Sequence, residues 1–133
     1  TEDKSGHRQP NSSSWYTYMY SPLAFLINED SASASEILAG AIKDYEYGTL
    51  IGTTTFGKGI VQTIFPLEDG DAVKLTTAKY FTPNGNYIHG VGIDPDIELE
   101  YEYLNPDGTE YDVKYDNQIQ KAVEVLTEEL SGK

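Results

Sequence analysis

The chain has 133 residues and a formal net charge of −13, from 22 acidic side chains against nine lysines and arginines. This length suits one domain with a modest core. The acidity argues against nucleic acids and anionic membranes as partners, because both attract basic surfaces. The chain has no cysteine, which excludes a thiol nucleophile, disulfides and cysteine-ligated zinc.

The first 20 residues differ in composition from the rest. Residues 1–14 are polar and predict a flexible leader or a loop cut from its partner. An aromatic patch follows at residues 15–20, which we interpret as an interface rather than as a strand edge. We therefore expect residues 1–20 to form a leader and an aromatic strand or linker, separate from residues 21–133.

The hydrophobic pattern of residues 21–133 predicts strands and helices in alternation. We expect strands at residues 23–28, 49–53, 60–66 and 72–81, with a hairpin turn at residues 68–71. Residues 33–45 have a helical apolar face and are followed by Gly48 as the helix end, and residues 117–130 form a closing helix. Tyrosines alternate with acids over residues 99–115, which predicts a further hairpin with a polar face. The whole pattern is typical of an α/β fold.

Ser33 stands where a run of small residues changes into the first predicted helix. A turn from strand to helix would hold its hydroxyl on a rigid corner, near helix-end amides that favour developing negative charge. The alternative is purely structural, since Ser33 and Glu36 also fit the S-x-x-E capping box.

Lys58 lies 25 positions after Ser33 in a glycine-framed loop, and Gln62 follows four positions later. A serine hydroxyl needs a base, and a lysine acts as one only when neutral, so burial away from carboxylates must lower its pKa of about 10.4. No other charged residue lies between Thr53 and Phe65. Singly, Lys58 would be a surface lysine and Gln62 a strand glutamine, and only their joint spacing with Ser33 indicates a hydrolase.

Residues 52–58 also satisfy the phosphate-loop pattern G-x-x-x-x-G-K. That motif requires Ser or Thr next and then a helix, whereas Gly59 and a strand-like segment follow. We expect the glycines to allow close backbone approach instead.

His7 and His89 lie far apart in sequence and support no catalytic triad. The acids of residues 94–98 lack the spacing of a calcium loop.

Residues 26–37, 39–41 and 52–62 together closely resemble the carboxy-terminal processing peptidases, also called tail-specific proteases, and residues 75–85 and 92–97 continue the resemblance. It implies Ser33 as nucleophile, Lys58 as general base and Gln62 as the residue that orients the lysine. The backbone amide of Ala34 would be one oxyanion donor. The implied fold is an α/β (α+β) fragment of a Clp-protease/crotonase-like β-β-α spiral core, with a mixed sheet and flanking helices.

The resemblance has consequences for the whole protein. It implies that residues 21–133 are the C-terminal part of the catalytic domain, without the upstream half that holds a second oxyanion donor and without the PDZ module. It also implies protein or peptide substrates, cleavage near substrate C-termini, an extracytoplasmic location, and no metal or organic cofactor. The alternative is a catalytically incompetent structural or binding fragment, which could self-associate through an exposed strand edge.

The sequence departs from the family at Asp30, where glycine is common. A carboxylate facing Lys58 would raise the pKa of the lysine and oppose catalysis.

Overall fold

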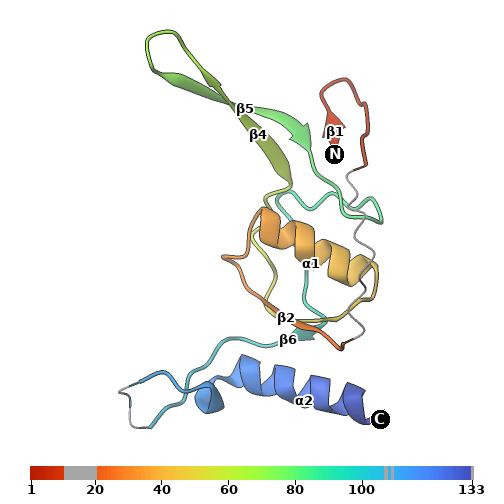
Figure 1. Cartoon of the computed structure of the whole chain (residues 1–133), viewed down its shortest axis with the longest axis vertical. Helices are drawn as coiled ribbons and strands as arrows, with labels where there is room; N and C mark the ends of the chain where they lie inside the picture. Colours follow the sequence, from red (N-terminus) through yellow and green to blue (C-terminus); the bar gives the residue numbers. More distant parts are fainter. Residues whose placement is uncertain (11–20, 107, 109, 133) are drawn as a thin grey trace.

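The computed structural model describes residues 1–10, 21–106, 108 and 110–132 (Figure 1). The predicted aromatic patch at residues 15–20 lies outside these described residues. Within them, neither helix is long and apolar enough to cross a membrane.

A parallel sheet forms the centre of the molecule. It contains β2 (Ala24–Ile27), β3 (Thr49–Gly52) and β6 (Ile97–Glu98) in the order β2-β3-β6. The helices α1 (Ala34–Asp44) and α2 (Asn117–Ser131) lie on opposite sides of these strands (Figure 1). Successive side chains on a strand point to opposite faces, and the neighbours Leu50 and Ile51 are both fully buried, which is the pattern of a sheet covered on both sides.

The core packs α1 against this sheet and against a loop that follows β5. Its buried apolar side chains are Ile27, Ala39, Ile42, Leu50, Ile88 and Ile93. Since the side chains from α1 are three residues apart, one face of the helix is buried, as its apolar periodicity predicts.

A second, antiparallel sheet has the order β1-β5-β4. It is formed by β4 (Ile60–Pro66) and β5 (Ala72–Lys79), which make a long hairpin projecting from the body, and by β1 (Glu2–Asp3) (Figure 1). The prediction of a flexible leader is wrong for residues 1–10, because β1 pairs with the end of β5. An ion pair of 2.7 Å between Arg8 and Glu2 closes the leader on itself.

The hairpin predicted over residues 99–115 forms only in part. The described part of that segment contains no strand and ends in the 3₁₀ helix η1 (Val113–Tyr115), but Tyr103 makes an isolated antiparallel bridge with Asp116. Tyr103 explains the difference. Its ring stacks on Tyr111 at 5.3 Å, and its hydroxyl accepts a hydrogen bond from Asp112 N–H at 2.7 Å. The Asp112 side chain caps η1 by accepting from Lys114 N–H. Side-chain packing and capping thus accompany a single antiparallel bridge in place of a longer strand ladder.

The end of α1 also differs from the expected stop at Gly48. Glu46 adopts a left-handed backbone with φ 51°. Its N–H donates to Lys43 O, and Tyr47 N–H donates to Ile42 O. These two bonds form a Schellman motif, a helix end that usually places glycine where Glu46 stands.

Candidate active site

Ser33 lies at the carboxyl end of β2 and is the N-cap of α1. Its backbone has φ 55° and ψ −109°, a conformation that L residues rarely adopt. The preceding loop is held by Asn28, whose carbonyl oxygen accepts from Ser31 N–H at 2.9 Å and whose own N–H donates to Ser31 Oγ at 3.1 Å. A serine on a strained strand-to-helix turn is the arrangement of a nucleophile elbow, although the G-x-S-x-G pattern is absent.

Lys58 lies on the loop between β3 and β4, which packs directly on the serine loop. Phe56 N–H donates to Ser31 O at 3.0 Å, and Gly57 O accepts from Gly90 N–H at 2.9 Å. Gly57 has φ 85°, and a Cβ atom there would lie 2.9 Å from Gly92 N. The lysine loop therefore has glycine where backbone meets backbone, as the sequence predicts.

A single buried carboxylate joins the two loops. Glu36, on the first turn of α1, is 0% exposed. Its Oε2 accepts from Ser33 N–H at 3.0 Å and from Lys58 N–H at 2.8 Å. Its Oε1 accepts from Gly57 N–H at 2.6 Å and from Thr55 Oγ1 at 2.7 Å. The structure thus brings the backbones of Ser33 and Lys58 to the same oxygen atom.

The Lys58 side chain is partly buried. Its ammonium has no ion pair or hydrogen bond with any residue that the structure describes. Asp30 is exposed and makes no ion pair with Lys58, and its N–H donates to Asn28 Oδ1. The departure at Asp30 therefore places no carboxylate on the lysine.

Other parts of the expected site are not joined. No hydrogen bond links Ser33 Oγ to Lys58 Nζ, and Gln62, exposed on β4 beside a bulge, makes none with Lys58. The N–H of Ala34, at the start of α1, has no acceptor within the described ranges.

Sequence reasoning assigned Glu36 only a local capping role. The bond from Ser33 N–H to Glu36 matches that part of the capping box. The remaining three donors lie 19 to 22 residues away on the lysine loop. The sequence shows only an S-x-x-E motif and, later, a loop in which Lys58 is the one charged residue. Neither pattern predicts that Glu36 binds the lysine loop.

The loop of Lys58 leads into strand β4 rather than into a helix, so the phosphate-loop interpretation lacks the helix that its motif requires after the lysine. In the described part of the chain, no group of three or more His, Asp or Glu side chains is arranged to hold a metal ion.

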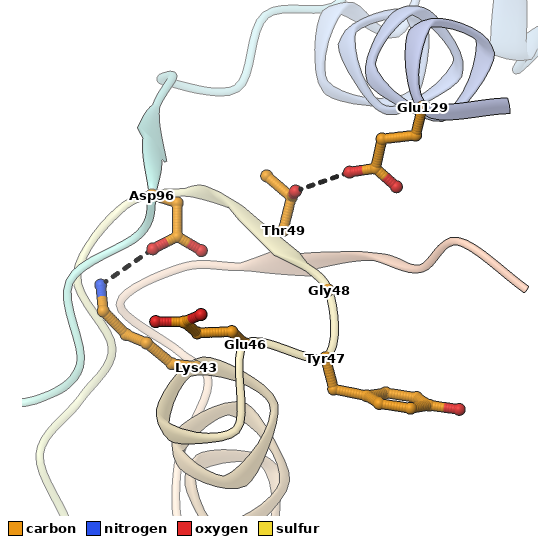
Figure 2. A pocket seen from close by; sticks show the side chains of 7 residues that line it. All are labelled: Lys43, Glu46, Tyr47, Gly48, Thr49, Asp96 and Glu129. Atoms are coloured by element: carbon orange, nitrogen blue, oxygen red, sulfur yellow. Dashed lines mark hydrogen bonds and ion pairs between the residues drawn. The ribbon is translucent and has the colours of Figure 1, made fainter. Parts of the chain in front are cut away.

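An open pocket of about 460 Å³ lies elsewhere (Figure 2). It surrounds Thr49 at the amino end of β3, whereas Ser33 and Lys58 follow the carboxyl ends of β2 and β3. Lys43 is paired with Asp96 at 3.2 Å, and Thr49 donates to Glu129 at 3.3 Å (Figure 2). Four of the polar side chains that line this pocket are thus paired with one another, and we assign no ligand to it.

Comparison with known proteins shows the family of this chain. Residues 1–99 match the family model of peptidase family S41. The chain belongs to peptidase family S41. A carboxy-terminal-processing protease of Bartonella bacilliformis is 58% identical over 79 residues, which cover 59% of this S41 chain and 18% of the relative. A probable CtpA-like serine protease of Staphylococcus epidermidis is 50% identical over 94 residues, covering 67% and 19%.

Among solved structures, the photosystem II D1 C-terminal processing protease matches with a TM-score of 0.57 and 48% identity, over 61% of this S41 chain and 21% of that protein. The α/β class with sheets and flanking helices is therefore confirmed. The matched part of this chain spans under a fifth of the length of the two curated relatives.

Proposed function

We propose that this S41 chain carries the Ser-Lys centre of a serine endopeptidase that cleaves peptide bonds near the C-termini of protein substrates. The observation that carries the proposal is the strained Ser33 turn, held by the same carboxylate that binds the Lys58 loop. The absence of an acidic partner for Lys58 among the described residues supports its role as a base. The names of the two curated relatives support the reaction class.

In this mechanism Ser33 Oγ attacks the carbonyl carbon of the scissile bond while neutral Lys58 takes its proton. The Ala34 amide stabilises the oxyanion of the tetrahedral intermediate. Lys58 then gives the proton to the leaving amine, and the acyl-enzyme forms. Water, deprotonated by Lys58, releases the acid product and restores the serine. Gln62 would orient the lysine after the side chains of β4 and the lysine loop move together.

We further propose that a second oxyanion donor comes from outside residues 21–133 and that the protein acts outside the cytoplasm. Removing one oxyanion donor typically costs about 10²–10³ in rate. We therefore expect slow turnover of protein substrates by this chain alone.

A second candidate is a binding or structural fragment without catalysis. The observation that favours it is the missing hydrogen bond between Ser33 Oγ and Lys58 Nζ. The two candidates differ in one property, the nucleophilicity of Ser33.

The test is acylation of the chain by p-nitrophenyl acetate. This small activated ester can react with a nucleophilic serine without the binding contacts that position a peptide substrate. We expect one acetyl group on Ser33, by intact mass and peptide mapping of chain quenched with acid before the acyl-enzyme is hydrolysed, and none in Ser33→Ala or Lys58→Ala. Lys74→Ala, on the exposed hairpin, is the matched lysine control and should be acylated like the unchanged chain. Absence of acetyl-Ser33, or its persistence in Lys58→Ala, would favour the non-catalytic fragment.

A further inference from the structure

We propose that Glu36 is a positioning residue that sets the separation of Ser33 from Lys58 through their backbone amides. This proposal rests on the proposed function, which makes Ser33 the nucleophile and Lys58 the base. The Glu36 carboxylate makes no hydrogen bond or ion pair with the Ser33 hydroxyl or the Lys58 ammonium, so it acts through the two backbones.

The contacts of Glu36 suit a carboxylate and no neutral side chain. All four partners donate, and a carboxylate accepts at both oxygens without a donor of its own. Three partners are backbone amides, which have no alternative role as acceptors. A protonated acid would point its O–H at a donor.

The burial of Glu36 would be costly without these bonds. A buried charge needs a partner, and no lysine, arginine or histidine among the described residues pairs with Glu36. The four donors and the positive end of α1 supply the compensation. Helix capping accounts for the bond to Ser33 alone, so the other three bonds serve to hold the lysine loop.

One oxygen atom, Oε2, bonds both Ser33 N at 3.0 Å and Lys58 N at 2.8 Å. The two nitrogens are therefore no farther apart than the sum of those distances. A displacement of about 1 Å between reacting groups can cost about 10² in rate. The same bond also holds the strained Ser33 backbone, which persists only when its surroundings enforce it.

Two substitutions separate this role from simple packing. Glu36→Leu replaces the glutamate by an apolar side chain of similar volume and removes all four hydrogen bonds. Glu36→Gln keeps one oxygen. Its nitrogen fits best at the Oε1 site, where the Thr55 hydroxyl can turn and accept, leaving only Gly57 N–H unpaired. The glutamine oxygen then still binds Ser33 and Lys58.

The experiment combines amide hydrogen exchange with the rate of Ser33 acetylation, on the whole chain under conditions where each variant is folded. We expect Glu36→Leu to raise exchange at both Ser33 and Lys58 and to slow acetylation about 10²-fold or more. We expect Glu36→Gln to raise exchange at Gly57 only and to slow acetylation less. Ile42→Val, a mild packing change at the far end of the same helix, should leave all three amides and the rate unchanged.

Unchanged exchange at Ser33 or at Lys58 in Glu36→Leu would overturn the proposal, as would a rate loss in Ile42→Val equal to that of Glu36→Leu. If Glu36→Leu does not fold, the exchange pattern of Glu36→Gln tests the proposal instead. Increased exchange over all of α1 would overturn the proposal, and increased exchange confined to Gly57 would support it. Exchange does not depend on catalysis. Lack of acetylation in the unchanged chain therefore counts against the proposed function, separately from this inference.

Discussion

The backbone of Ser33 carries a conformation that glycine adopts without penalty and serine does not. With φ 55° and ψ −109°, it lies in a sparsely populated region of backbone conformation that costs an L residue about 1–3 kcal/mol. Strain of this kind is retained where the surrounding structure enforces it, and Glu36 and the loop closed by Asn28 supply that constraint here.

We therefore expect Ser33→Gly to be more stable than Ser33→Ala, although both lack the nucleophile. Glycine relieves the φ strain but gains freedom in the unfolded chain, so the expected difference in the free energy of unfolding is about 0.5–1 kcal/mol. Urea unfolding of the two variants measures it. Equal stability of the two variants would mean that the Ser33 turn is not strained.

Tyr80 gives the fold a pH dependence next to α1. Its hydroxyl lies 3.5 Å from Glu36 O, and burial, followed by the charges of Asp44 and Glu36, raises the pKa of Tyr80 to about 12. The fold favours the neutral phenol, whose ordinary pKa is about 10. This contribution to stability is complete below pH 10 and is lost as the pH rises toward 12.

We expect Tyr80→Phe to flatten the decline of stability between about pH 10 and 12 while changing it little at pH 8. The measurement is the urea midpoint at several pH values. The pKa of Tyr111 is raised to about 12 by its hydrogen bond to Asp116, so Tyr111 contributes its own part of the alkaline loss of stability, and that part remains in this variant. A Tyr80→Phe chain with the full alkaline decline would contradict the assignment.

Among the elements, the end of α1 offers a substitution with a defined sign. Glu46 occupies the left-handed position of the Schellman motif, where glycine is the usual residue. We expect Glu46→Gly to raise the free energy of unfolding by about 1 kcal/mol, because the Cβ penalty of the left-handed backbone disappears. Thermal and urea unfolding measure it.

Glu46→Ala is the control, because it removes the same side-chain charge and keeps the Cβ atom. It should show no such gain. If both substitutions stabilise equally, the cause is the lost carboxylate rather than the backbone.

Six elements could be predicted from local patterns, because β2, α1, β3, β4, β5 and α2 each carry their own apolar periodicity. The two-residue strands β1 and β6 could not. They exist only through pairing with β5 and β3, as in Glu2 with Lys79 and Ile97 with Ile51.

The elbow at Ser33 was predictable from a strand followed by a helix. The link through Glu36 was not, because three of its donors arrive from a loop placed by tertiary structure.

At the level of the whole molecule, the hairpin of β4 and β5 stands away from the core (Figure 1). In the described part of the chain, β4 is an edge strand, with β5 on one side and no strand on the other. The hairpin exposes large apolar side chains: Val61, Ile64, Phe65, Leu67, Val73 and Leu75. An unpaired apolar edge favours pairing with another chain, whereas the net charge of −13 opposes association of two copies.

We therefore expect self-association through the β4 edge that strengthens with salt, since salt screens repulsion between the acidic copies while leaving apolar contacts in place. Sedimentation equilibrium at about 0.05 M and about 0.5 M NaCl, where screening differs severalfold, measures it. Ile64→Lys places a charge on the exposed edge strand and should weaken association at both salt concentrations. Val123→Lys changes the net charge equally on exposed α2, at the opposite end of the molecule (Figure 1), and should have a smaller effect. Equal weakening by both substitutions would assign the effect to net charge, and a monomer under all conditions would show that the hairpin edge does not pair with a second copy.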